Sequence, residues 1–325
     1  MRLPQPRGPV SEALADGLRG SAPLSITVPR LPVERVLHDD DLQLSLWICY
    51  EMHYRGFDGV SDSWEWDPSL IGLRGELEAQ WLAALRWLAP PQAVDPDAVP
   101  AALAELVAAD DGPSLAGFLQ REATVEQFRE FVVQRSVYHL KEADPHSWAI
   151  PRMEGSTKAA LVEIQADEYG GGRVDRMHSE LFRDVMRALD LDDTYGRYVD
   201  DASAVTLAVT NTISLFGLRR ELGGALVGHL AAFEMTSSLP NRRYGNGLRR
   251  LGGNATATRF YDEHVEADAV HEQIAAHDLC GGYARQHPEA ASEILFGAKA
   301  CLAVEAEFGR HLLDRWAGDS LSRTA

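Results

Sequence analysis

One helical segment in the last quarter of the chain carries two histidines and an aspartate at spacings suited to a metal ion. His264, Asp268 and His271 stand at positions i, i+4 and i+7. At 100° per residue, the three side chains lie within about 60° of one another on one helix face. Two imidazoles and a carboxylate are ligands that divalent first-row metals accept. The alternative is a polar helix face that contacts only solvent, so the hypothesis needs partners elsewhere.

Two glutamates stand in apolar surroundings where an acid is unexpected. Glu234 lies in a mostly apolar stretch, residues 226–235, and Glu168 closes an apolar-rich helix that begins near Ala159. Burying a glutamate is costly unless it is paired with a charge or bound to a metal. A salt bridge would also explain Glu234, and a capping or surface position would explain Glu168.

A further histidine, His178, follows Glu168 by ten residues. On an unbroken helix the two side chains would lie about 80° apart. The intervening residues include Gly170, Gly171 and Gly172, and glycine permits a kink or a break. We therefore expect the chain to bend here and bring both side chains inward. The alternative for His178 is a hydrogen-bonded core histidine.

These residues supply three histidines and three acids from three helices, which is the inventory of a carboxylate-bridged di-iron centre in a helix bundle. Imidazole and carboxylate ligands suit iron and manganese. The common four-helix version uses two Glu-x-x-His pairs, and the chain has none at the relevant places, so the ligand order is not that of ferritin. The three cysteines lack CxxC spacing, which argues against a cysteine-based zinc site or a disulfide framework and indicates reduced thiols in a cytoplasmic protein.

The elements that must position these residues are helical. No segment of four to eight residues alternates in the manner of a strand, so the chain is predicted to be all-α, with about ten helices in one bundle. The proline-rich residues 1–32 predict a flexible N-terminal tail or a surface strap. Residues 33–325 predict a single helical domain, with an N-terminal helical layer over about 33–122 and the metal-binding bundle over about 123–318. Helices are expected, among others, at residues 157–168, 173–189, 222–237 and 256–286.

Charge and hydropathy exclude two classes of partner. The 325-residue chain carries 49 acidic and 31 basic residues, a formal net charge of −18. Such a field repels a phosphate backbone, so no nucleic acid is expected as a partner. No run of about 18 apolar residues is present, so no membrane span is expected. The N-terminal residues lack the apolar region of a signal peptide, which again favours a cytoplasmic location.

The order of the possible ligands resembles that of a known family. Glu, His, Glu and then His-x-x-x-Asp-x-x-His resembles the haem-oxygenase-like di-iron oxidases and oxygenases. The segments 141–146, 167–172 and 233–240 are similar to the bacterial group called iron-containing redox enzymes, and residues 50–57 are similar to its N-terminal part. The resemblance covers roughly residues 125–316.

The resemblance implies a haem-oxygenase-like helical bundle with extra N-terminal helices and a defined set of ligands. It assigns Glu168, His178 and His271 to one iron, and Glu234, His264 and Asp268 to the other. Glu142 is similar in position to an extra carboxylate ligand of N-oxygenating members. The alternative for Glu142 is a structural acid beside Lys141 or a partner of His146.

The implied function is that of a non-haem di-iron oxidoreductase with two Fe(II) per chain as cofactor and O2 as co-substrate. Relatives carry out N-oxygenation, desaturation and oxidative C–C cleavage, and Glu142 favours N-oxygenation. The expected substrate is a small amine, amino acid or carboxylic acid of specialised metabolism. Arg242 and Arg243 are candidates to bind a substrate carboxylate, or else are surface charges.

An external electron donor and a homodimer are compatible with the resemblance. Two other functions stay open from the sequence. One is a metal-free enzyme on the same scaffold, and the other is a non-catalytic helical metal-binding protein.

Overall fold

The computed structural model describes the backbone of residues 1–323 and the side chains of residues 1–265 and 270–318. Within this backbone every regular element is a helix, which confirms the all-α prediction. The helices are α1 Pro9–Leu18, α2 Asp40–Glu51, α3 Pro68–Leu88, α4 Val99–Ala108, α5 Leu115–Arg121, α6 Val125–His139, α7 Asp144–Ser147, α8 Gly155–Glu168, α9 His178–Ala188, α10 Ala204–Leu218, α11 Gly223–Arg250, α12 Ala255–Gln273, α13 Gly282–Gln286 and α14 Ala291–Arg323.

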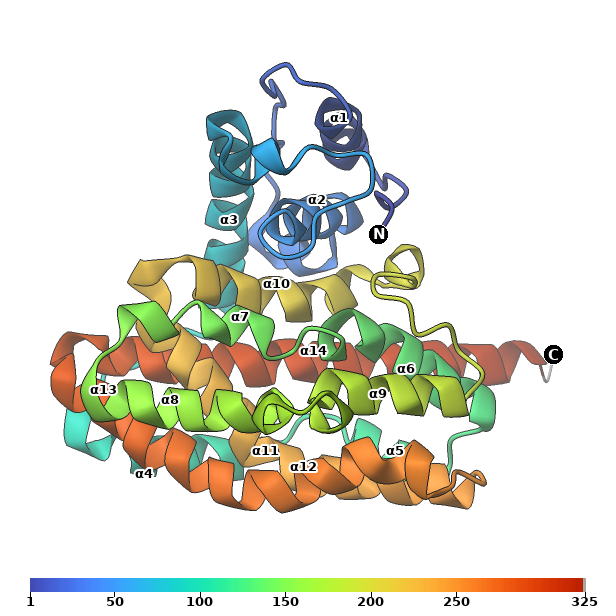
Figure 1. Cartoon of the computed structure of the whole chain (residues 1–325), viewed down its shortest axis with the longest axis vertical. Coiled ribbons are helices and arrows are strands. Elements are labelled where there is room, and N and C mark those ends of the chain that lie inside the picture. The colour runs from blue at the N-terminus through green and yellow to red at the C-terminus, as the bar shows by residue number, and fades with distance from the viewer. Residues whose placement is uncertain (324–325) are drawn as a thin grey trace.

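The helices form a bundle with a smaller layer above it (Figure 1). The long helix α14 packs along α11, and α11 packs in turn against α12. Helix α10 crosses between the two parts, contacting α2 on one side and α6 and α14 on the other. One continuous apolar core runs through both parts, including Leu44 and Leu77 in the layer and Phe260 and Phe296 in the bundle. Among the described helices, none has the length and apolar character needed to cross a bilayer.

The N-terminal residues differ from the expected flexible tail over 1–32. They contain helix α1, whose Leu14 and Leu18 are buried against the layer. The Asp41 carboxylate accepts hydrogen bonds from the backbone N–H groups of Val10 and Ser11, at 2.9 and 2.7 Å. At the N-terminal end of a helix, the first backbone N–H groups have no partners within the helix, and a carboxylate can accept hydrogen bonds from them. Because Asp41 lies 31 residues from Val10, this anchor was not visible in the local composition.

The boundary of the N-terminal layer also needs correction. The layer was expected to extend to about residue 122, but it consists of α1, α2 and α3 and ends near Leu88. Helix α4 packs against α11 and α14, and α5 packs against α11. Leu103 of α4 and Leu119 of α5 are fully buried there. These two helices therefore belong to the bundle, because their apolar faces are completed by bundle helices.

Helix α11 continues beyond the predicted end at residue 237. Pro240 lies inside it, although proline removes one helical hydrogen bond and crowds the carbonyl four residues earlier. Polar side chains bond to the helix backbone on either side of this point. Thr236 donates to the Ala232 carbonyl at 2.6 Å, and Asn241 donates to the Ser237 carbonyl at 3.1 Å. The long helix carries residues of the possible metal centre and its cavity along one face.

The segment 256–286, predicted as one helix, is three consecutive helical pieces. Helix α12 passes into a π-helix, Ile274–Gly281, and then into α13. The π-helix widens the turn locally and packs against α8 and α11. It begins three residues after His271, so the irregular turn adjoins the predicted metal-binding face.

Candidate metal centre

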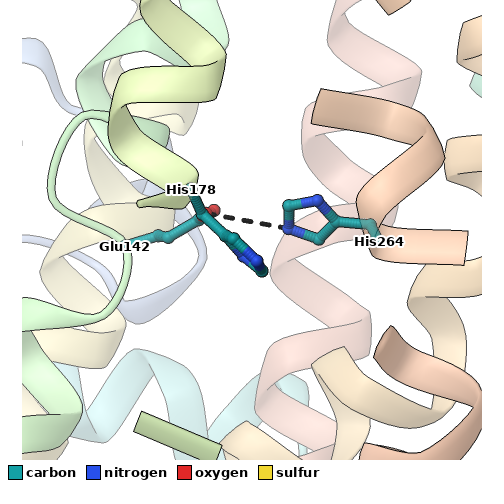
Figure 2. A group of neighbouring side chains, drawn as sticks. All are labelled: Glu142, His178 and His264. Carbon is teal, nitrogen blue, oxygen red and sulfur yellow. Dashed lines mark ion pairs between the residues drawn. The ribbon is translucent and has the colours of Figure 1, made fainter. Parts of the chain in front are cut away.

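Three side chains from separate segments converge in the interior of the bundle. Glu142 follows α6, His178 begins α9, and His264 lies in α12 (Figure 2). The Glu142 Oε1 atom is 3.9 Å from His178 Nδ1 and 3.7 Å from His264 Nε2. The three possible ligand atoms all lie within 4.8 Å of one another, and all three residues are buried. We call these residues the first group.

A second group consists of Glu168 at the end of α8, Glu234 in α11 and His271 in α12. Its possible ligand atoms also lie within 4.8 Å of one another. The His271 Nδ1 atom is 3.4 Å from Glu234 Oε2. Both Glu234 and His271 are buried. The second group thus offers two carboxylates and one imidazole.

The two groups adjoin each other through Glu168. Its Oε2 atom lies 3.0 Å from Nδ1 of His178, which belongs to the first group. The rings of His178 and His264 are also close, with centroids 4.3 Å apart. A carboxylate between two sets of ligands is the arrangement that a bridged pair of metal ions requires.

The turn after α8 brings Glu168 and His178 together. Gly170, Gly171 and Gly172 all have positive φ, at 65°, 59° and 79°, a conformation that glycine adopts without steric cost. A 3-10 turn at Val174–Arg176 follows, and α9 starts only at His178. The helix predicted at 173–189 is therefore shorter, because the glycine turn extends past residue 173.

Two contacts position Glu142, which lies in the short connection between α6 and α7. One is made by Glu142 itself and the other by its neighbour Lys141. The His139 Nδ1 atom is 2.5 Å from Glu142 Oε2. The neighbouring Lys141 is buried and donates to Glu51 Oε2 at 2.7 Å. Tyr195 donates to the same carboxylate. A buried ion pair with satisfied oxygens holds one geometry firmly, so Lys141 anchors this connection to helix α2.

In His264 and His271, the ring nitrogen that faces away from the candidate metal site has a partner in the protein. That contact orients the other ring nitrogen toward the site. The Phe260 carbonyl accepts a hydrogen bond from Nδ1 of His264 at 2.8 Å, which leaves Nε2 toward Glu142. The Asp167 carboxylate lies 2.9 Å from Nε2 of His271, with Nδ1 toward Glu234. Metal-binding histidines characteristically place their second nitrogen on a carbonyl or carboxylate in this way.

Four inward polar atoms are buried and make only ion pairs within the two groups, with no aligned hydrogen bond among the described residues. They are Glu142 Oε1, Glu168 Oε2, His178 Nδ1 and His271 Nδ1. Buried polar atoms are nearly always paired, and these four face the same small region. All are oxygen or imidazole nitrogen, the donors that iron and manganese accept. The residues therefore fit a pair of such ions.

The charges of the site are closely coupled. Burial favours a higher pKa for Glu142, but the imidazoles of His139 and His264 outweigh it and lower this pKa below the usual range. Burial also disfavours protonated His178, yet the Glu168 carboxylate outweighs burial and raises the pKa of His178. For His271, burial is outweighed by Glu234 and Asp167, which raise its pKa to about 9. Protons on imidazoles thus balance the buried carboxylates in the metal-free protein.

The structure places together the six predicted ligands whose side chains it describes, but groups them differently from the expected division. Glu142 joins His178 and His264, whereas His271 joins Glu168 and Glu234. The expected sets had paired His178 with His271 and His264 with Glu234. The assignment of ligands to the two groups differs because the glycine turn places His178, at the start of α9, beside His264 of α12. Asp268 lies in α12, but its side chain is outside the described residues.

A cavity of about 510 Å³ opens beside the two groups. Its inner wall includes Glu142, Glu168, Glu234 and His264, and Arg243 lies in its wall as well. The Arg243 side chain donates to Ser114 Oγ at 3.3 Å. Arg242, predicted with Arg243 as a substrate-binding residue, is exposed and is not part of this wall. Apolar and aromatic side chains, among them Leu230, Phe233 and Tyr138, cover much of the remaining surface.

Three neighbours of the site were not found by sequence reasoning. His139 stands three residues before Glu142, Asp167 immediately precedes Glu168, and Gln165 stands one helical turn before it. The i, i+3 spacing of Gln165 and Glu168 is a local pattern that could have been recognised. The pairing of Asp167 with His271 joins residues 104 positions apart and depends on the fold.

Comparison with known proteins adds two findings. A family model described as iron-containing redox enzyme matches residues 129–306, more than half of the chain. A nitrosourea synthase from Streptomyces achromogenes subsp. streptozoticus is 29% identical over 149 residues. The match covers 45% of this chain and 31% of that relative, so the chain corresponds to only about a third of the relative's length.

Gly170→Ala tests the turn that joins the two groups. A Cβ atom at Gly170 would lie 2.6 Å from backbone atoms of Arg176 and Met177, next to His178. At Gly172, which also has positive φ, a Cβ atom would meet nothing within 4 Å. Both alanines pay a conformational cost of about 1–2 kcal/mol. We expect only Gly170→Ala to weaken Fe(II) binding, by about tenfold or more, in anaerobic titration. Equal affinities in the two variants would contradict the role of this turn.

The pH dependence of metal-free protein tests the environment of His271. Its pKa is raised from 6.5 to about 9, so its stabilising contribution is complete below pH 6.5 and is lost as pH rises through about 9. Fe(II) must displace this proton, so we expect its affinity to increase over the same range. A histidine-specific NMR titration should give a midpoint near 9. A midpoint below 6.5 would show that Glu234 and Asp167 do not hold a protonated ring.

Proposed function

The chain belongs to the iron-containing redox enzyme family, and from this premise we propose that it is an O2-activating oxidoreductase with a non-haem di-iron centre. The observation that carries the proposal is the contact between two interior groups made only of carboxylates and imidazoles, all of them buried except the partly buried Glu168. Each group offers three ligand atoms within 4.8 Å of one another, and the inner atoms contact one another only as ion pairs between carboxylate and imidazole.

We assign one iron to Glu142, His178 and His264, and the other to Glu168, Glu234 and His271. Glu168 is the proposed bridging carboxylate, because its Oε2 atom is 3.0 Å from His178 Nδ1. Asp268 stays a predicted ligand, because of its spacing from His264 and His271 and because of the resemblance. Two ferrous ions, when bound, would supply electrons for the reduction of O2.

The protein's own residues prepare the site for that chemistry. Phe260 and Asp167 hold the outer nitrogens of two histidines, which fixes the direction of the inner ones. Carboxylates that are already ionised need no proton loss before a cation binds. The apolar wall of the cavity, which includes Phe233 and Leu230, limits the access of water to the reacting groups.

The proposed substrate is a small amine, amino acid or carboxylic acid, with N-oxygenation as the favoured reaction. Two observations support this preference. Glu142 lies in the first group, as expected for N-oxygenating members. The relative is named a nitrosourea synthase, and a nitroso group contains a nitrogen–oxygen bond.

Oxygen transfer places a requirement on the electron supply. Converting N–H to N–OH with one atom of O2 releases the other atom as water. The conversion consumes two electrons and two protons besides the substrate. An external electron donor is therefore part of the proposal, because the centre must return to the ferrous state.

The test is anaerobic loading with Fe(II), counting of the bound iron and measurement of O2 consumption. We expect about two irons per chain in a carboxylate-bridged centre. His264→Ala and His271→Ala should each remove at least one iron while helical circular dichroism is retained. His277→Ala is the matched control, because His277 is exposed and only six residues beyond His271.

Three results would contradict the proposal. Absence of iron would favour a metal-free enzyme of the same scaffold. Bound iron without O2 consumption, with or without a small amine, amino acid or carboxylic acid, would favour a metal-binding protein. Full iron in both histidine variants would refute the ligand assignment.

The paired arginines offer a test of substrate binding. Arg243 lines the cavity, whereas its neighbour Arg242 is exposed and outside the wall. A hydrogen bond to a charged group contributes about 1.5–3 kcal/mol. We expect Arg243→Ala to raise KM at least about tenfold for a carboxylate-bearing substrate, and Arg242→Ala to leave KM unchanged. Equal effects of the two substitutions on KM would refute a specific role for Arg243.

A further inference from the structure

The two carboxylate oxygens of Glu142 face different partners. The inner oxygen, Oε1, lies toward the first group, 3.9 Å from His178 Nδ1 and 3.7 Å from His264 Nε2 (Figure 2). The outer oxygen, Oε2, lies 2.5 Å from Nδ1 of His139. An ionised carboxylate can only accept hydrogen bonds, so Nδ1 of His139 carries the hydrogen and donates it. One oxygen is thus engaged by a donor outside both groups, and the other faces the possible ligands.

The ring of His139 has little freedom to turn away from Glu142. Its centroid is 4.6 Å from that of Phe182 in α9 and 4.9 Å from that of Phe260 in α12. Both phenylalanines are fully buried, and the side chain of His139 is itself only 17% exposed. Side chains in a close-packed interior keep defined rotamers. The packing of α6, α9 and α12 therefore fixes the direction in which His139 donates.

Phe260 connects the two imidazoles that meet Glu142. Its ring packs against His139, and its backbone carbonyl accepts the hydrogen bond from Nδ1 of His264 at 2.8 Å. His139 thereby approaches Oε2 of Glu142 while Nε2 of His264 lies toward Oε1. The two contacts come from one packed unit, so the carboxylate cannot rotate to exchange its oxygens without disturbing both.

The number of free oxygens determines how a carboxylate binds metal ions. With both oxygens free, it can bind one ion through two oxygens or bridge two ions. A hydrogen bond to an ionised carboxylate is roughly twice as strong as a neutral one, so the bond from His139 competes with a second metal–oxygen bond at Glu142. Glu168 differs, since its Oε2 atom lies 3.0 Å from Nδ1 of His178, which is itself a possible ligand and not an outside donor.

We infer that His139 is a positioning residue that limits Glu142 to a terminal ligand bound through one oxygen, and so leaves the bridging role to Glu168. A coordination position of the first ion then stays open, as a reactive metal site requires. The inference rests on the proposed function for the presence of the metal ions. It deepens that function by assigning different binding modes to two carboxylates of the centre.

The first test is a crystal structure of the parent protein loaded with Mn(II), which accepts the same ligand types as iron. We expect one oxygen of Glu142 on the metal ion and the other still on Nδ1 of His139, with Glu168 bound to both ions. Binding of both Glu142 oxygens to metal, on one ion or across two, would overturn the inference.

Two variants assign the binding mode to the N–H group of His139. His139→Phe keeps an aromatic ring against Phe182 and Phe260 but removes the donor. In its Mn(II) structure we expect both Glu142 oxygens on metal. With Fe(II), we expect O2 consumption to slow by about ten- to a hundredfold, at unchanged circular dichroism. His139→Asn places an amide N–H near the position of Nδ1, so it should keep the one-oxygen mode and recover most of the rate.

A merely structural histidine would give a different pattern. Equal loss of metal and helical content in both variants, with the binding mode of Glu142 unchanged, would overturn the inference. Misfolding of His139→Phe does not protect it, because the metal-loaded parent tests it without any variant.

Failure of the inference can be distinguished from failure of the proposed function. One-oxygen binding of Glu142 in protein that does not consume O2 refutes only the proposed function. O2 consumption by protein in which both Glu142 oxygens bind metal refutes only the role of His139. Protein that binds no metal at all refutes both.

Discussion

The structure depends on one electrostatic constraint, which is the burial of several carboxylates and imidazoles inside an apolar helix bundle. Glu142, Glu234, His178 and His271 are all buried. Charges removed from water are costly unless opposite charge compensates them closely. In the metal-free protein, protons on His178 and His271 provide part of that compensation, as their raised pKa values indicate. A pair of divalent cations would provide more, and the inner carboxylate and imidazole atoms of the two groups lie close enough together to bind them.

The N-terminal layer also contributes to this charge compensation, because one of its buried acids helps to position the site. Lys141 follows α6 and binds the buried Glu51 of α2 at 2.7 Å. Its ammonium also lies 4.3 Å from the ring centre of Tyr54, a favourable contact for a cation. The adjacent residue is Glu142, so the position of this carboxylate depends on a layer that contributes no member of either group. Arg135 and Glu305 form a second, partly buried ion pair in the cavity wall, which keeps the charges of that wall in place.

Much of this arrangement follows from the sequence, and the remainder depends on contacts between distant residues. The helical periodicity, the glycine turn and the common face of His264 and His271 are local patterns, and the all-α class followed from them. The division into two groups did not follow, since it depends on the direction in which α9 leaves the turn. The packing of α1 depends on Asp41, more than 20 residues beyond the end of that helix. The helix predicted to end at residue 237 continues past Pro240, because tertiary packing of α11 overrides the local preference of proline.

The central claim is that two adjacent groups hold two irons with only nitrogen and oxygen ligands. Iron K-edge X-ray absorption of anaerobically Fe(II)-loaded protein tests it most directly, because the spectrum reports the elements around each iron. The account predicts nitrogen and oxygen neighbours and a second iron within about 4 Å, the spacing of two-metal sites. It also predicts that the iron–iron contribution disappears in His264→Ala. Sulfur neighbours, or fully loaded protein with isolated irons, would contradict the account.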